Sequence, residues 1–152
     1  MTFILESAAF ENGGRMPRRC SGLAEEVSPP LSWSGLPEGT SELALICEDL
    51  DAPFPITHWV LYGIPATTSS IPEGMSASSL SHGILQGKRS FGKFEYMGPA
   101  PPGRRPHRYS FKLYALDQPL GLSAWANRKA LHKAMSGHVL GVAELVGTFA
   151  RD

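Results

Sequence analysis

The chain has 152 residues, of which 42% are hydrophobic and 18% charged, and its 14 basic and 14 acidic residues give zero formal net charge. This is the composition of a globular protein, and it argues against a disordered chain and against a nucleic-acid-binding protein. No run of about 18 apolar residues is present, so stable membrane insertion is not expected.

The length fits a single domain spanning residues 1–152, with room for a core that needs no disulfide. The two cysteines, Cys20 and Cys47, form no CxxC pair and are expected to be reduced thiols. The first residues lack the basic flank and long apolar run of a signal peptide, so we expect a cytoplasmic protein.

Five segments have the apolar patterns of β-strands. They are residues 3–5, 42–50, 58–64, 108–116 and 142–150. In the second, LALIC (43–47) is continuously apolar, as in a strand that is covered on both faces. The fourth alternates, so its odd-numbered residues from Tyr109 to Ala115 should share one face.

One helix is predicted, over residues 124–135, with Ser123 as its N-cap and Gly137 at its end. Its inward stripe would consist of Trp125, Leu131, Ala134 and Met135. Two long segments, 27–40 and 66–83, are rich in Pro, Gly, Ser and Thr and are read as loops. The pattern therefore predicts a mainly antiparallel β domain with one or two C-terminal helices.

Polar residues gather where two of the predicted strands end or begin. Asp49 and Asp51 close one strand, and their spacing would point both carboxylates to one site if the strand persists. The alternative is that both aspartates are turn formers. His58 begins the next strand, either as a site residue or as a hydrogen-bonded structural histidine.

The segment GPAPPGRRPHRYSF (98–111) reads as a stiff loop leading into a strand, because proline fixes φ and glycine admits unusual backbone shapes. His107 and Tyr109 lie two residues apart and so share a face, while Arg108 points the other way as a surface or ion-pairing residue. Gly98 and Gly103 could present backbone N–H groups to an anion.

These groups can converge at one end of a sheet, where imidazole, phenol and backbone donors would suit a small anion. An aspartate beside a histidine would favour the protonated imidazole. Affinity for an anion should then rise as the pH falls through about 6.5.

Four segments resemble the phosphatidylethanolamine-binding protein (PEBP) family, in particular its small bacterial and archaeal, Raf kinase inhibitor-like branch. They are SPPLSW (28–33), EDLDAPFPITHWVLYGIP (48–65), GPAPPGRRPHRYSFKLYALD (98–117) and HVLGVAELVGTFAR (138–151). The resemblance implies a large central antiparallel sheet with a smaller sheet against it and helices near the C-terminus. It also implies a pocket that binds phosphate-like anions or phospholipid headgroups.

Carried over residue by residue, the resemblance assigns the ligand-binding positions of this pocket. They are Asp49, His58, His107, Tyr109, Gly98, Pro53 and Asp51, with Asp51 the one that braces the loop. Leu50 stands where the family usually has proline, which loosens the turn between the two acids. KRSFG (88–92) replaces a more acidic segment and would make one rim of the pocket more basic.

The resulting prediction is a binding protein with no cofactor and no metal. A module that regulates a kinase or protease is the alternative, and pairing with another protein or with a second copy is left open. An enzyme that uses Asp49, His58 and His107 is a weaker alternative, because the chain has neither G-x-S-x-G nor H-E-x-x-H.

Overall fold

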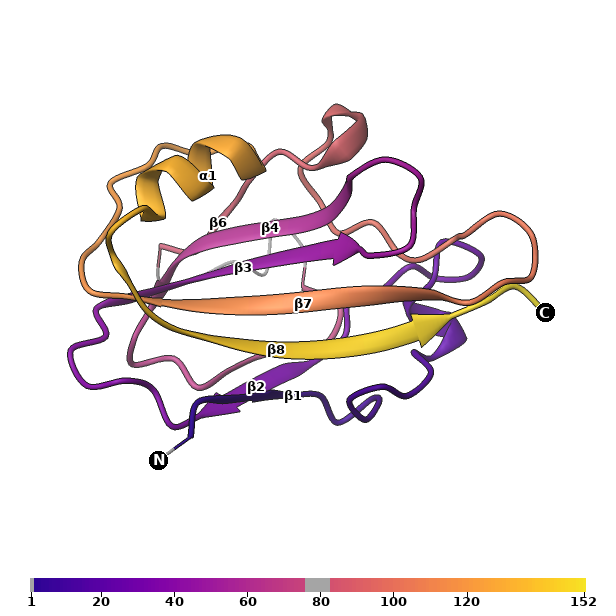
Figure 1. Ribbon diagram of the computed structural model, residues 1–152, viewed down its shortest axis with the longest axis horizontal. Helices are drawn as coiled ribbons and strands as arrows, with labels where there is room; N and C mark the ends of the chain where they lie inside the picture. The colour runs from indigo at the N-terminus through magenta and orange to yellow at the C-terminus, as the bar shows by residue number, and fades with distance from the viewer. Residues whose placement is uncertain (1, 76–82) are drawn as a thin grey trace.

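The computed structural model describes residues 2–75 and 83–152, and within these ranges the chain folds as two antiparallel sheets (Figure 1). The larger sheet has the strand order β6-β4-β3-β7-β8. Its strands are β3 (Glu42–Asp49), β4 (Ile56–Pro65), β6 (Leu85–Gln86), β7 (His107–Leu116) and β8 (Val139–Phe149). The smaller sheet has the order β1-β2-β5, with β1 at Ile4–Glu6, β2 at Leu31–Ser34 and β5 at Ser70–Ile71. The predicted mainly β fold with a large and a small sheet is confirmed.

The central strand β3 is covered on both faces, as its apolar run predicts. The odd-numbered residues of 43–47 join a core cluster that includes Leu5 and Trp33 of the smaller sheet. The even-numbered residues join a second cluster with Leu131 and Met135 of the helix. Strand β7 divides in the same way, with Tyr109, Phe111, Leu113 and Ala115 all in the first cluster.

Helix α1 is shorter than predicted and runs from Arg128 to Met135. Asn127, rather than Ser123, is the N-cap, and its side chain accepts a hydrogen bond from the Ala130 N–H. The preceding backbone is held by Tyr62, whose hydroxyl donates to the Ser123 carbonyl at 2.6 Å and accepts from the Ala126 N–H at 3.0 Å. This tertiary contact competes with a helical start at residue 124.

The predicted inward stripe of the helix is correct for Leu131 and Met135, which are buried. It is wrong for Trp125, which precedes the helix, has φ 72° and is 66% exposed. Gly137 has φ 81° just after the C-cap Ser136, in the left-handed conformation that ends many helices.

The prediction of loops over 27–40 and 66–83 is wrong for β2 and β5, which lie inside these segments. Residues 76–82 of the second segment lie outside the described residues. The described residues also include the short 3₁₀ turns η1 (Arg18–Cys20) and η3 (Ser90–Gly92). In the part of the chain that the structure describes, no helix has the length and apolarity needed to cross a membrane.

Both cysteines are buried and free. Burial raises the pKa of both thiols, that of Cys20 to about 11. These thiols are therefore packing groups of the core and remain protonated near neutral pH.

Candidate functional site

The end of β3 lies beside the beginnings of both its neighbours, because β4 and β7 pair with it in antiparallel fashion. In the register of these strands, Asp49 is opposite Ile56 on one side and Tyr109 on the other. The polar residues that follow or begin three strands are thus brought to one end of the larger sheet.

A cavity of about 440 Å³ opens at this end of the sheet. The predicted residues that line it are Asp49, Pro53, His58, Gly98, His107 and Tyr109. Its remaining walls are mostly apolar. They are formed by Gly22, Glu26, Ala52, Phe54, Ile56, Phe91, Met97, Ala100, Pro101 and Pro102.

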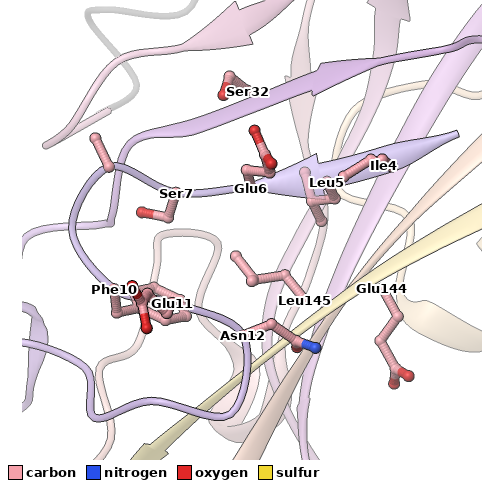
Figure 2. Close-up of a pocket in the computed structure, with 11 residues that line it drawn as sticks. Ile4, Leu5, Glu6, Ser7, Phe10, Glu11, Asn12, Ser32, Glu144 and Leu145 are labelled. Atoms are coloured by element: carbon pink, nitrogen blue, oxygen red, sulfur yellow. The ribbon is translucent and has the colours of Figure 1, made fainter.

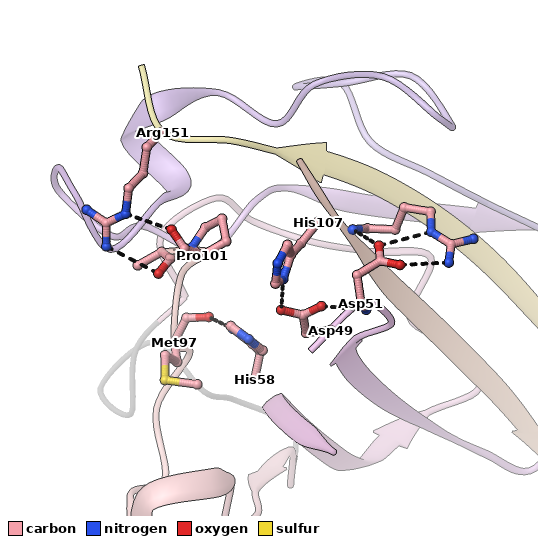
Figure 3. A network of polar contacts seen from close by, with 9 residues as sticks. Asp49, Asp51, His58, Met97, Pro101, His107 and Arg151 are labelled. Atoms are coloured by element: carbon pink, nitrogen blue, oxygen red, sulfur yellow. Dashed lines mark hydrogen bonds and ion pairs between the residues drawn. The ribbon is translucent and has the colours of Figure 1, made fainter. Parts of the chain in front are cut away.

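Asp49 and His107 form a buried pair in the wall of this cavity (Figure 3). Nδ1 of His107 lies 2.7 Å from Oδ2 of Asp49, and the two side chains are 10% and 5% exposed. Because a carboxylate accepts, Nδ1 carries the hydrogen, and Nε2 is the nitrogen left for a ligand. When the ring is protonated, Nε2 becomes a donor beside an anionic partner.

His58 is oriented by a carbonyl instead of a carboxylate. Its Nδ1 lies 2.7 Å from the Met97 oxygen (Figure 3), so Nδ1 donates and the neutral ring presents Nε2 as an acceptor. Burial lowers the pKa of His58, opposed by the Met97 carbonyl and by Asp49. His58 therefore favours its neutral form, and the aspartate expected beside a histidine lies against His107 instead.

Tyr109 lies between the two histidines. Its ring meets His58 edge-on at 5.2 Å between centroids and stacks on His107 at 6.5 Å. Burial, followed by the charge of Asp49, raises the pKa of its hydroxyl, which therefore keeps its proton and can donate it to a hydrogen-bond acceptor.

Asp51 is bound to Arg108, and it is not among the described residues that line the cavity. Its Oδ2 accepts from the backbone N–H and from Nε of Arg108 at 2.7 and 3.0 Å, and its Oδ1 from Nη2 at 2.9 Å. The Arg108 hydrogen bonds lower the pKa of Asp51 to about 2. Asp49 thus faces the cavity, while Asp51 braces the loop between β3 and β4.

The turn after β3 makes use of Leu50, where the family usually has proline. The Leu50 N–H donates to the Arg108 carbonyl at 2.8 Å, and the Asp51 N–H donates to Oδ1 of Asp49 at 2.8 Å. A proline at position 50 would lack the first of these donors. The turn is therefore fixed by hydrogen bonds and not by ring stiffness.

Gly98 is needed for close packing of two backbone segments. A Cβ at this position would lie 2.4 Å from the Cys20 oxygen and 2.7 Å from the Gly22 nitrogen. Its N–H donates to Oε2 of Glu26 at 3.1 Å, so the predicted free donor for an anion is already engaged. Gly103 has φ 69°, serves as a turn residue and is not among the described lining residues.

Glu26, which lines the cavity, and Arg151, which braces its proline-rich loop, are among the residues that sequence reasoning missed. The Arg151 side chain donates to the Pro101 carbonyl at 2.6 Å and to the Ala100 carbonyl at 3.3 Å (Figure 3). Both residues are far from the loop in sequence, and no local pattern marks either contact. The proline-rich loop is thus held in place from both ends of the chain.

The mouth of the cavity carries exposed aromatic rings. Phe54 and Phe91 line it and are 57% and 70% exposed. The expected basic rim does not form from Arg89, which is buried and donates its guanidinium to the carbonyls of Glu95 and Ser90, and the exposed Lys88 is not among the described lining residues. The rim is apolar.

A second cavity, of about 590 Å³, lies beside β1 and β8 (Figure 2). Its charged lining groups in the described chain are the carboxylates of Glu6, Glu11 and Glu144. Glu144 already accepts a hydrogen bond from the Ser110 hydroxyl at 2.6 Å. Because its charged lining groups are all carboxylates, this second cavity is unsuited to binding an anion.

No group of three or more His, Cys, Asp or Glu side chains is placed to hold a metal ion within residues 2–75 and 83–152.

Comparison with known proteins settles the family. The model of the family described as phosphatidylethanolamine-binding protein matches residues 6–150. The chain belongs to the phosphatidylethanolamine-binding protein family. A UPF0098 protein of Methanothermobacter thermautotrophicus is 44% identical, over 97% of this chain and 98% of the relative.

Two crystal structures have the same fold as this PEBP family member. The PEBP homolog CT736 from Chlamydia trachomatis superposes with a TM-score of 0.91 at 34% identity, covering 99% of both chains. YbcL from E. coli, described as a new member of the mammalian PEBP family, gives 0.92 at 27% identity, covering 100% of both chains.

Proposed function

We propose that this PEBP family member binds a small molecule through a phosphate-like oxyanion, such as the headgroup of a phospholipid. The observation that carries the proposal is the convergence of Asp49, His58, His107 and Tyr109 on one cavity. Tyr109 supplies a hydroxyl donor, and protonated His107 supplies Nε2–H backed by the Asp49 carboxylate. The family membership supports the same type of ligand.

The apolar rim favours an ester of phosphate over the free ion. A bare anion gains nothing from Phe54 and Phe91, whereas an attached hydrocarbon group would cover their exposed rings. The cavity thus has a polar floor, formed by Asp49, His58, His107 and Tyr109, and an apolar mouth, formed by Phe54 and Phe91. This arrangement suits an amphipathic ligand.

Titration calorimetry with inorganic phosphate and with a short-chain phosphatidylethanolamine tests this proposal. Both should bind more tightly at about pH 5.5 than at about pH 8, because an imidazolium donates to an anion and a neutral imidazole nitrogen does not. The variant His107→Ala should lose most of the affinity.

The control is His138→Ala. His138 forms a similar pair with Asp117, at 3.0 Å, but the register of β7 with β8 places it at the opposite end of the sheet. If His107→Ala and His138→Ala bind like the wild type, the proposed function is wrong.

A further inference from the structure

The two aromatic residues at the mouth of the cavity are among the most exposed apolar side chains of the protein. Phe54 and Phe91, 57% and 70% exposed, are two of the three most exposed large hydrophobic residues in the described chain, and both line the cavity. Phe54 lies between Pro53 and Pro55, which restrict the backbone on both sides of it. One exposed apolar side chain is ordinary, but two at one opening form an apolar patch.

The backbone holds the ring of Phe91 outward against its own conformational preference. Phe91 has φ 68°, in the left-handed region that a bulky residue seldom adopts. The turn around it is closed by the Gly92 N–H, which donates to the Arg89 carbonyl at 3.2 Å, and by the Arg89 N–H, which donates to the Lys93 carbonyl at 2.8 Å. The buried Arg89 guanidinium also donates to the Ser90 carbonyl at 2.8 Å. These contacts retain a strained backbone that exposes an aromatic ring, which is typical of a functional position.

Positive charge is concentrated in the segment that supplies much of the mouth. Residues 88–108 include six basic residues and one acidic residue, although the whole chain has zero formal net charge. Arg89 is buried and Arg108 is paired with Asp51, which leaves four exposed cations. They are Lys88, Lys93, Arg104 and Arg105, and none of them forms an ion pair within residues 2–75 and 83–152.

Three of these cations lie close to residues that line the opening. Lys93 follows Phe91 by two residues, and Arg104 and Arg105 follow the lining residue Pro102 by two and three. Three residues of chain span at most about 10 Å. The apolar mouth is therefore bordered by unpaired positive charge, outside the lining itself.

A face that is both apolar and cationic fits a partner that is both apolar and anionic. A second copy of this chain fits poorly, because a two-fold interface would place the same cations opposite one another. The surface of a bilayer that contains anionic lipids has both properties. Its interfacial region accepts aromatic rings, and its headgroups attract Lys and Arg side chains.

We propose that the face around the cavity mouth docks onto the surface of an anionic lipid bilayer. Phe54 and Phe91 enter the interfacial region, while Lys93, Arg104 and Arg105 contact lipid phosphates. This inference rests on the proposed function, because docking in this orientation presents the opening of the cavity to the headgroups that it binds. The contact is peripheral and involves side chains at loop tips.

Co-sedimentation with vesicles of phosphatidylcholine, with and without phosphatidylglycerol, tests the docking. The wild type should bind the vesicles that contain phosphatidylglycerol, and the bound fraction should fall as salt is added, because salt screens exposed charges. The double variant Phe54→Ser, Phe91→Ser should lower the partition coefficient on the order of tenfold or more. The triple variant Lys93→Gln, Arg104→Gln, Arg105→Gln should have an effect of similar size.

Each variant has a matched control away from the mouth. Leu140→Ser with Val142→Ser removes two apolar residues that are 41% and 47% exposed, at the end of β8 opposite to the cavity. The triple variant Lys112→Gln, Lys129→Gln, Lys133→Gln changes the net charge as much as the mouth variant does, on β7 and α1. Both controls should partition like the wild type.

The inference is overturned if the wild type does not bind the anionic vesicles, or if mouth and control variants lose binding equally. It is also overturned if His107→Ala abolishes vesicle binding as completely as the Phe54, Phe91 double variant, because capture of single headgroups would then account for the binding. A dimer that forms without vesicles and is lost in the double variant would make this face a self-interface instead. In each case, phosphate binding that depends on His107 in calorimetry would leave the proposed function standing. Vesicle binding that is lost only in the two mouth variants supports the docking.

Discussion

Nδ1 of His107 lies 2.7 Å from Oδ2 of Asp49, and the other oxygen of that carboxylate accepts the Asp51 N–H at 2.8 Å. One carboxylate therefore fixes both the ring of β7 and the turn that follows β3. Because the strands are adjacent in the sheet, the pair needs no flexible loop to form it. The register of β7 against β3 therefore orients Nε2 of His107 toward a ligand in the cavity.

The first prediction concerns the charge of Asp49. Asp49→Asn keeps the shape of the side chain but removes the negative charge that stabilises a protonated His107 ring, so phosphate affinity at about pH 5.5 should fall on the order of tenfold. Calorimetry measures the loss. Asp117→Asn, which alters the similar pair with His138, should bind phosphate like the wild type, and an unchanged affinity in Asp49→Asn would contradict the role of the pair.

The second prediction concerns the protonation of His58. Burial lowers its pKa in the folded state, whereas the unfolded chain takes up the proton at about 6.5. Stability from this group is therefore fully present above about pH 6.5 and decreases as the pH falls below that value. Long-range ¹H–¹⁵N NMR should show hydrogen on Nδ1 and a titration midpoint below 6.5.

The same effect should appear in thermal denaturation across this pH range. The melting temperature of the wild type should fall on acidification more steeply than that of His58→Gln. Burial also lowers the pKa of His132, so the difference between the two proteins isolates the contribution of His58. A midpoint at or above 6.5 would show that His58 is not held neutral.

The local pattern of apolar residues in the sequence was sufficient to predict the strands that carry the site residues. Burial on one face produces the alternation of Tyr109, Phe111 and Leu113, and burial on both faces produces the apolar run of β3. Both patterns are visible in the sequence. Once these strands are antiparallel neighbours, Asp49, His58 and His107 must meet at one end of the sheet. The family resemblance assigned the same residues.

Contacts between segments that are distant in the sequence could not be predicted from local patterns. The carboxylate of Glu26 meets the Gly98 N–H across 72 residues, and Arg151 meets Pro101 across 50. The helix start was displaced to Asn127 because Tyr62 of β4 binds the backbone at Ser123 and Ala126. In each case tertiary packing, which has no local signature, decided the outcome.

The third prediction concerns the Asp51–Arg108 ion pair. Because Arg108 holds the pKa of Asp51 at about 2, below its ordinary value, the stabilisation is present above about pH 4 and is lost as the pH falls toward about 2. Asp51→Asn should lower the melting temperature at neutral pH, and the difference from the wild type should shrink over that window. A difference that stays constant down to pH 2 would exclude this pair as its source.

The fourth prediction concerns the packing of Gly98. Alanine at this position would place its Cβ 2.4 Å from the Cys20 oxygen, so the backbone must shift at a cost of about 1–3 kcal/mol in the free energy of unfolding. Urea denaturation measures this loss. Gly22→Ala is the comparison, because its nearest contact is a side-chain atom, Oε2 of Glu26 at 3.2 Å, and it should cost less. Equal losses would show that the backbone contact is not limiting.

The fifth prediction separates the floor of the cavity from its rim. Phe54 and Phe91 are exposed, so Phe54→Ser and Phe91→Ser should change the free energy of unfolding by no more than about 0.5 kcal/mol. Neither ring is needed to bind a bare ion, and the affinity for inorganic phosphate should stay the same. The affinity for a short-chain phosphatidylethanolamine should fall several-fold, because hydrocarbon burial contributes roughly 25 cal/mol per Å².

The control for the rim is Trp125→Ser, which removes another exposed aromatic ring, one that lies outside the described cavity lining. Calorimetry with the two ligands should show no change in either affinity for this variant. If the rim variants weaken both ligands equally, Phe54 and Phe91 act by shaping the floor. If they weaken neither, the hydrocarbon part of the ligand does not contact the mouth, and a small free anion would fit the cavity better than a lipid headgroup.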